Sequence, residues 1–258
     1  MPTHNKKYIF LMVILPTSST AVLAQDSTGF RSLFGEGLTL RVGIGYIAVR
    51  DEFISDEKFS SSIPFFGVTW SKYHETYDFR LHLEYQHTSN LKNYNVSAEI
   101  TQFRLVLDYL YPISQGDILS RKGDIILGPT CELFEHYRRE NIAGSENLQS
   151  GITLISGGLR SEAFWPLTTS LQLRAAAELT LLSLSLRTVN SNTNNESPAK
   201  LLTLFTGIDA DGEIGISCRI TESFYGSAGY RFVVTRVSAW DSFIAASDNL
   251  IVSLSYGF

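Results

Sequence analysis

Residues 77–109 read YDFRLHLEYQHTSNLKNYNVSAEITQFRLVLDY, in which apolar or aromatic side chains alternate with polar ones at both ends. A period of two is typical of a β-strand whose two faces meet different surroundings. The polar break at 88–97 separates the two segments, so the pair reads as a hairpin. The alternating apolar residues are Tyr77, Phe79, Leu81, Leu83 and Tyr85 in the first segment and Phe103, Leu105, Leu107 and Tyr109 in the second.

The same alternation recurs along the chain. Residues 38–46 and 171–181 repeat it clearly, whereas 149–161 is ambiguous. No interior linker or low-complexity tail divides the chain, so we expect a single domain of ten strands. The predicted strands are 38–49, 63–73, 77–88, 98–111, 123–137, 149–161, 168–181, 201–219, 223–235 and 249–258.

The connections between these strands alternate in length. Long polar connections follow the odd-numbered strands, and mostly short ones follow the even-numbered strands. This alternation is typical of a bacterial outer-membrane barrel with short periplasmic turns and long extracellular loops, and a β-sandwich gives no reason for it. The predicted fold class is therefore all-β, a transmembrane antiparallel β-barrel of about ten strands in the cell outer membrane. The long connections are 50–62, 89–97, 138–148, 182–200 and 236–248.

In such a barrel the polar face of each strand points inward. The predicted inward charges are of both signs, and ten strands enclose a lumen little wider than that of an eight-stranded barrel. We therefore expect an interior filled by ion pairs and water rather than an open channel. The predicted inward residues are Arg41, Asp78, Arg80, His82, Glu84, Arg104, Asp108, Glu132, Arg174, Glu178, Asp209, Asp211, Glu213, Arg219 and Arg231.

Residues 1–24 have the features of a signal peptide. Two lysines, Lys6 and Lys7, precede a short apolar run, and the small residues at 21–24 provide a signal-peptidase site. The apolar run is shorter than the roughly 18 residues of a spanning helix. The predicted organisation is thus a signal peptide at 1–24 and an outer-membrane β-barrel domain at 25–258.

The charge, the spacing of histidines and cysteines, and the C-terminal residues limit the classes of possible binding partner. A net charge of -5 argues against nucleic acid. The histidines and cysteines do not group at ligand spacing, so we expect neither a metal site nor a cofactor. The C-terminal SLSYGF, which ends on Phe258, resembles the signature that the barrel-assembly machinery of outer-membrane proteins reads. The expected partners are this machinery and the lipid or lipopolysaccharide of the outer membrane, and the oligomeric state stays open.

Polar side chains interrupt the outward face where the first segment of the hairpin ends. Continuing the outward register past Tyr85 gives His87 and Ser89, and running the second segment backward through Thr101 gives Glu99. Polar residues on a lipid-facing surface are costly except near the interface, so we expect these three to converge at the extracellular rim. Their residue types are those of a base, a nucleophile and an orienting carboxylate.

The segment His87-Thr88-Ser89-Asn90, with Glu99 on the next strand, resembles the lipid A 3-O-deacylase family of outer-membrane barrels. The resemblance implies a serine-hydrolase site on the outside of the barrel. Ser89 would be the nucleophile, His87 the general base, Glu99 its orienting partner and Asn90 a donor to the oxyanion. The implied substrate is an ester-linked acyl chain of lipopolysaccharide. This chain departs from that family in having ten predicted strands rather than eight, and in carrying the segment on its third strand.

A non-enzymatic barrel explains the same features. Loops 138–148 and 182–200 would then form a structural or adhesive surface, or the barrel would bind or conduct a small solute. Ten strands also resemble the omptin proteases, but we find no paired acidic motif in the loops that matches theirs. The two functions to be separated are therefore a lipid hydrolase and an outer-membrane barrel without enzymatic activity.

Overall fold

The structure is a computed structural model, and it describes most of the chain beyond the predicted signal peptide. Residues 1–24 lie outside the described residues, so that prediction stays untested. None of the described residues belongs to a helix long and apolar enough to cross a membrane. The described residues are 36–52, 55–74, 76–93, 96–118, 121–141, 148–189, 199–203, 206–238 and 242–258.

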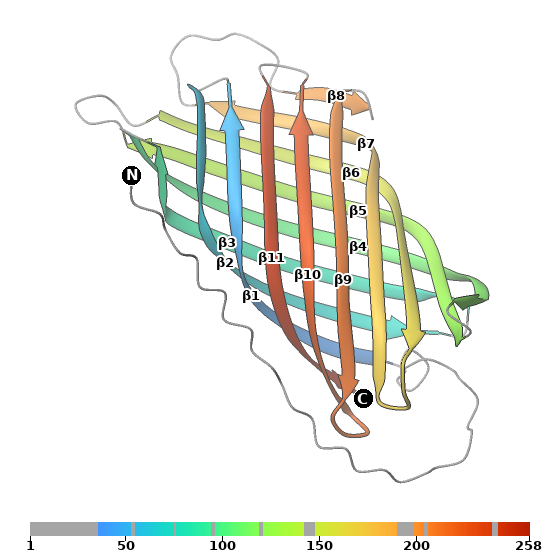
Figure 1. Cartoon of the computed structure of the whole chain (residues 1–258). Coiled ribbons are helices and arrows are strands. Elements are labelled where there is room, and N and C mark those ends of the chain that lie inside the picture. Colours follow the sequence, from blue (N-terminus) through green and yellow to red (C-terminus); the bar gives the residue numbers. More distant parts are fainter. Residues whose placement is uncertain are drawn as a thin grey trace.

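The described residues form eleven strands in a single antiparallel sheet that closes on itself (Figure 1). The closure joins the first strand to the last, because β1 pairs with β11. The short β8 and the longer β9 pair with successive parts of β7, so together they fill one position of the barrel. The barrel thus has ten positions, as predicted. The strands are β1 Glu36–Asp51, β2 Ser55–Tyr73, β3 Asp78–Asn93, β4 Val96–Ile118, β5 Arg121–Asn141, β6 Leu148–Pro166, β7 Leu171–Val189, β8 Ala199–Thr203, β9 Gly207–Arg219, β10 Phe224–Val237 and β11 Phe243–Gly257.

The strands run farther at the extracellular end than the alternation pattern predicted. β1 ends at Asp51 and β2 begins at Ser55, so most of the predicted loop 50–62 is paired strand. The β3–β4 hairpin likewise continues to Asn93 and Val96. These stretches looked like loops because their outer faces are polar. The long connections therefore project from the extracellular rim mainly as extended hairpins.

The outer surface is apolar over the span that a membrane covers. Leu40 and Ile44 of β1 are 53% and 63% exposed, and Leu250 of β11 is 64% exposed. Charged residues instead point into the barrel, where Arg80 and Arg104 are buried. An apolar exterior around a charged interior is the arrangement of an outer-membrane barrel, in which hydrocarbon replaces water outside. The structure confirms the predicted fold and the placement in the outer membrane.

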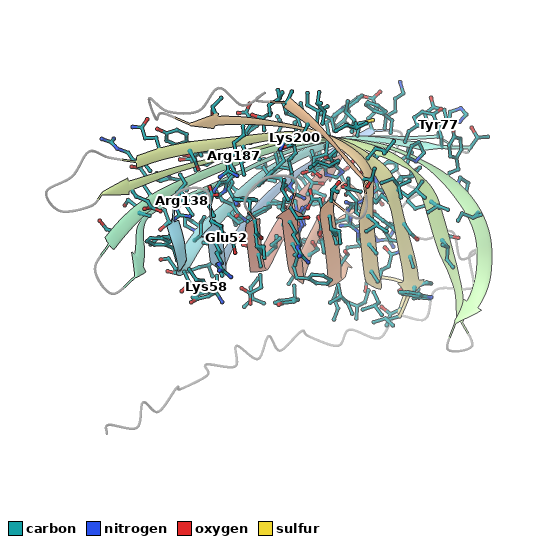
Figure 2. All side chains as sticks on the ribbon, turned by 90° about the horizontal axis from the view of Figure 1, so that it is seen from above. Glu52, Lys58, Tyr77, Arg138, Arg187 and Lys200 are labelled. Carbon is teal, nitrogen blue, oxygen red and sulfur yellow. The ribbon has the colours of Figure 1, made fainter. Side chains whose placement is uncertain are left out.

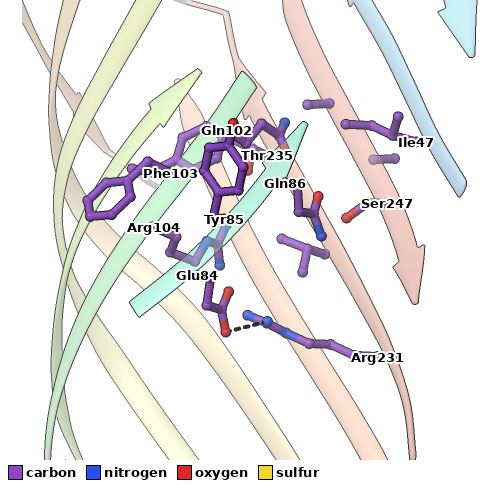
Figure 3. A pocket seen from close by; sticks show the side chains of 14 residues that line it. Ile47, Glu84, Tyr85, Gln86, Gln102, Phe103, Arg104, Arg231, Thr235 and Ser247 are labelled. Atoms are coloured by element: carbon purple, nitrogen blue, oxygen red, sulfur yellow. Dashed lines mark hydrogen bonds and ion pairs between the residues drawn. The ribbon is translucent and has the colours of Figure 1, made fainter. Parts of the chain in front are cut away.

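Arginine–carboxylate pairs fill the middle of the lumen. Arg231 Nη1 lies 2.6 Å from Glu84 Oε1 (Figure 3), and Arg231 also pairs with Asp211. Arg41 Nη2 lies 2.5 Å from Glu213 Oε2. The cavity beside these pairs measures about 30 Å³, which is room for about one water molecule. The middle of the lumen is therefore filled by ion pairs, as predicted.

The lumen is wider near the periplasmic rim, where the strands are joined by short turns. A cavity of about 150 Å³ there is lined by Arg41, Arg80 and Arg174 together with serine and threonine side chains. Arg174, Glu213 and Arg219, which we predicted to point inward, are half-buried. The other predicted inward charges are all buried.

The extracellular end of the lumen is an apolar core, so the prediction of ion pairs and water throughout the interior is wrong for this part. At the same level the outer face carries Arg50 and Lys58, which are exposed. The strands extend beyond the hydrocarbon layer here, and polar, hydrated surroundings outside a barrel favour a polar exterior and an apolar interior. The barrel therefore reverses its inside and outside chemistry along its length. The buried cluster comprises Ile47, Val49, Phe59, Ile63, Leu91, Ala98, Ile100, Phe134, Ile152, Leu154, Leu202, Val237, Phe243 and Ala245.

A few charged groups lie within this apolar core. Arg187 pairs with Asp51, and Asp51 also accepts a hydrogen bond of 2.9 Å from Ser150 Oγ. The guanidinium of Arg138 lies 4.4 Å from the centre of the Phe59 ring. Figure 2 shows Arg138 and Arg187 between the walls of the barrel. Each of these charges thus has a partner that offsets part of its cost of burial.

Phe59→Ala is expected to lower the free energy of unfolding by about 3–5 kcal/mol, because the ring is fully buried in the apolar core. Urea unfolding in detergent micelles measures this change. The matched control is Lys58→Ala on the neighbouring exposed position, with an expected change within about 0.5 kcal/mol. Equal effects of the two substitutions would contradict a dry core at this level.

The wild-type barrel is expected to be electrically silent in a planar lipid bilayer. The apolar core closes the extracellular end of the lumen, and the arginine–carboxylate pairs fill the middle. Single-channel recording of the reconstituted protein should therefore show no long-lived conductance above the lipid baseline. Regular unitary steps from folded wild-type protein would contradict a sealed lumen and favour a solute channel.

Candidate functional site

His87 lies on the outward face of β3, at the upper edge of the apolar band. Its ring stacks on Tyr85 with the ring centroids 6.4 Å apart and the planes 12° from parallel. Below Tyr85 the same face continues with Leu83, which is 40% exposed. Tyrosine rings commonly mark the boundary between hydrocarbon and head groups. His87 therefore lies where acyl chains meet polar head groups.

A β-bulge follows His87 directly. Thr88 pairs with Ile100 and Leu91 pairs with Ala98, so two residues of β3, Ser89 and Asn90, face the single residue between Ile100 and Ala98 on β4. The extra residue turns Leu91 into the apolar core, where it is fully buried, and leaves Ser89 exposed on the outer face. Bulges are frequent beside active sites because they re-aim side chains.

The histidine ring contacts two residues of β4. His87 Nδ1 lies 3.0 Å from Thr101 Oγ1, which is hydrogen-bond distance. His87 Nε2 lies 4.0 Å from Glu99 Oε1, within the range of an ion pair but longer than a hydrogen bond. The side chains of His87 and Glu99 are each 38% exposed. The structure thus brings His87, Glu99 and Thr101 together on the outer surface.

Ser89 shares this face but makes no hydrogen bond to His87 among the described residues. Two residues along one strand are separated by about 7 Å, so the Ser89 hydroxyl reaches the ring only if the ring turns away from Thr101. The side chain of Asn90, the predicted oxyanion donor, lies outside the described residues. The catalytic roles of Ser89, His87, Glu99 and Asn90 stay predictions.

Thr101 is the residue of this cluster that the sequence analysis did not select. It lies directly opposite His87 in the β3–β4 register. The outward register of β4 passes through Thr101 on the way to Glu99, so the signal was present. A threonine hydroxyl on a strand is ordinarily a structural feature, and only the cross-strand pairing reveals that it contacts the ring.

This arrangement has the parts of a proton relay. A carboxylate beside one ring nitrogen favours the tautomer that carries its proton there, and the other nitrogen then accepts a proton from a hydroxyl. In the structure that hydroxyl belongs to Thr101. Ser89 is the more exposed of the two hydroxyls and lies nearer to the extracellular rim. The geometry therefore provides a base, a carboxylate and two hydroxyls at the membrane surface.

The fold has solved counterparts, whereas the sequence has no matched relative. No protein-family model matches the chain, and no curated protein matches it. The translocator domain of the autotransporter NalP from Neisseria meningitidis aligns over 90% of both chains, with a TM-score of 0.51 and 10% identity. The outer membrane protease OmpT from Escherichia coli aligns over 86% of this chain and 96% of its own, with a TM-score of 0.45 and 7% identity.

Neisserial surface protein A is also similar, over 86% of this chain and 97% of its own, with a TM-score of 0.40 and 11% identity. Identities this low carry information about the fold alone. The NalP translocator domain supports the barrel architecture that the alternating strands predicted. No protein-family model and no curated protein connects the chain to lipid A deacylases, so the chemistry rests on this chain's own residues.

Proposed function

We propose that this protein is an acyl-ester hydrolase that acts on lipid A or a similarly acylated lipid of the outer leaflet. Ser89 is the nucleophile, His87 the general base, Glu99 the carboxylate that orients the ring, and Asn90 the donor to the oxyanion. The observation that carries the proposal is the contact of His87 with Glu99 and Thr101 on the lipid-facing surface, at the level where the apolar band ends.

The depth of this cluster matches the depth of an ester bond in a membrane lipid. Acyl esters lie between the polar head group and the hydrocarbon chains. His87 lies directly above Tyr85 and Leu83, which face hydrocarbon, and beside Ser89 and Glu99, which belong to the polar rim. A lipid that remains in the leaflet therefore presents its ester to these side chains without leaving the membrane.

The free-energy cost of placing His87 and Glu99 on the outer face of the barrel also supports a functional role. An ionisable side chain on the outer face of a barrel is destabilising, by an amount that falls toward the interface. The next outward positions toward the membrane on these strands are aromatic, Phe103 and Tyr85, whereas Thr101 and Ser89 beside His87 and Glu99 are polar. A histidine and a glutamate paired across two strands at this boundary do not stabilise the barrel in the membrane, so a chemical role explains their presence better.

Mass spectrometry of lipid A tests the proposal in cells. Cells that produce the protein are expected to contain lipid A that lacks one ester-linked acyl chain, and cells without it are expected to retain the full set. Purified protein in mixed micelles should release the corresponding fatty acid. Identical lipid A from both cell types, together with no fatty acid release by folded purified protein, would end the hydrolase proposal.

The second candidate is an adhesive or structural barrel without catalysis. It is favoured by the extracellular extension, in which a rigid apolar core with a polar exterior holds the hairpins away from the membrane. Strands β7 and β8 occupy 182–189 and 199–203, so only 190–198 of the predicted loop 182–200 can be deleted without removing paired strand.

Deletion of 190–198 is expected to abolish aggregation of cells that display the protein if this stretch is the binding surface. The deletion leaves the His87 cluster untouched, so it should not alter acyl release. Counting free cells after settling measures aggregation, and the lipid A spectrum of the same culture measures hydrolysis. The adhesive function would be favoured by two results together. The deletion abolishes aggregation, and lipid A is intact both in cells that produce the protein and in cells that do not.

A further inference from the structure

A row of cationic side chains crosses the outer surface of the barrel at its closure. In the strand registers Lys58 of β2 pairs with Arg50 of β1, Arg50 pairs with Ile244 of β11, and Ile244 pairs with Arg236 of β10. These four residues thus form one rung across four adjacent strands. Neighbouring strands lie about 4.8 Å apart, so the three cations span about 15 Å.

The side chains of the row cannot point into the barrel. Arg50 and Arg236 each lie between buried residues of their own strand, and Phe59, which follows Lys58, is buried too. Val49, Phe59 and Val237, which are at most 1% exposed, pack the interior at this level. Arg50, Lys58 and Arg236 are themselves exposed. Figure 2 shows Lys58 at the outer edge of the barrel, on the far side of the wall from Arg138. The cations therefore face the surroundings of the protein.

The row carries more positive than negative charge. Arg50 Nη2 lies 2.9 Å from Glu52 Oε1, and Glu52 Oε2 accepts a hydrogen bond of 3.2 Å from the backbone of Ser242. Lys58 and Arg236 have no carboxylate partner among the described residues. Among the described side chains, one carboxylate thus faces three cations, and two of the cations are available to an anion from outside.

The rungs below the row become apolar in two steps. Two rungs down the strands, Tyr46 and Phe232 are 51% and 48% exposed and share their rung with Ser62 and Asp248. One rung further, Ile44 and Leu250 are 63% and 64% exposed and face the membrane. Arg50 and Tyr46 are four residues apart, about 13 Å along the strand. At the usual tilt of about 40° this places Arg50 about 10 Å above Tyr46 along the membrane normal. The rung itself rises by about 3 Å per strand, so the heights of the cations differ by about 9 Å. The head-group layer is about 5–8 Å thick on each side of the hydrocarbon, so the cations lie in its outer part and at its outer edge.

We propose that Lys58, Arg50 and Arg236 bind the phosphate groups of a phosphorylated lipid in the outer leaflet, while its acyl chains lie on the apolar rungs of the same strands. Arginine binds phosphate through a planar pair of N–H donors, and lysine attracts it as a point charge. The row lies on β2, β1, β11 and β10, whereas the His87 cluster lies on β3 and β4. The inference goes beyond the proposed hydrolysis and does not depend on it.

Native mass spectrometry of the detergent-solubilised protein tests the row with two probes, diphosphorylated lipid A and the same lipid after removal of its phosphates. Wild-type protein is expected to retain the diphosphorylated form about 25-fold more tightly, since each of the two available cations contributes about a fivefold factor at an anionic lipid surface. The combined variant Arg50→Gln/Lys58→Gln/Arg236→Gln is expected to lose this preference. The experiment measures lipid binding and not fatty acid release. Its result can therefore be interpreted even if the hydrolase proposal fails.

Two further variants make the result decisive. Lys72→Gln removes an exposed cation near the periplasmic rim, where Lys72 pairs with Glu36 at 3.4 Å, and is expected to keep the wild-type preference. Arg50→Lys/Arg236→Lys keeps the charge and is expected to retain most of the preference for the diphosphorylated lipid. This variant tests the role of charge even if the triple variant does not fold. An unchanged preference in a folded triple variant, or an equal loss in Lys72→Gln, would overturn the proposal. Loss of preference in Arg50→Lys/Arg236→Lys would overturn the role of charge.

Discussion

Ser89→Ala and His87→Ala are each expected to lower acyl release from lipopolysaccharide by about 10⁴-fold or more, while leaving a folded barrel. Nucleophile and base act as one unit, so the double variant should be no slower than either single variant. Fatty acid release in mixed micelles measures the rate, and the shift in gel mobility on heating reports whether the barrel is folded. Both side chains lie outside the lumen and the apolar core, which is why folding should survive.

Thr101→Val separates the two hydroxyls of the cluster. Thr101 holds His87 Nδ1 away from Ser89 in the structure, so its loss frees the ring to reach Ser89 and is expected to keep or raise the rate of acyl release. Ser62→Ala, an exposed outward serine on β2, is the matched control and should keep the wild-type rate. Full activity of Ser89→Ala together with inactivity of Thr101→Val would assign the nucleophile to Thr101 and refute the role of Ser89.

Arg231→Met is expected to lower the free energy of unfolding by about 3–5 kcal/mol, enough to prevent most of the protein from folding. Arg231 contacts Glu84 at 2.6 Å and also pairs with Asp211, and all three are buried in the lumen. Removing the arginine leaves two carboxylates without their principal cation in a space that admits little water. Urea unfolding in detergent micelles and the folded fraction on a gel without heating measure the change.

Arg236→Met on the same strand is the matched control for this loss. Arg236 faces outward and is exposed, so its substitution is expected to change stability by no more than about 0.5 kcal/mol. The combined variant Arg231→Met/Glu84→Leu/Asp211→Leu replaces the whole charged group and is expected to recover part of the stability, because apolar residues fill the same space. If Arg231→Met were as stable as Arg236→Met, the lumenal pairs would not be what holds the barrel together.

The sequence predicted the barrel well because the relevant signal is local. The alternation of Leu81 and Leu83 with Arg80 and Glu84 assigns each side chain to one face of a strand, whatever the partner strand is. It also placed His87 and Glu99 on the same outward face, where the structure has them. The ends of the strands were predicted less well, since the alternation loses its contrast once the outer face meets water.

The sequence by itself determined that this chain closes into an outer-membrane barrel with charges inside, because a period of two is a property of each strand alone. Only the tertiary structure decided which side chains meet across strands. The contact of His87 with Thr101 depends on the β3–β4 register, and the direction of Ser89 depends on the bulge beside it. The basic row depends on the closure of β1 against β11, which joins the two ends of the described chain. Such contacts are set by register and closure, and neither is written in the pattern of a single strand.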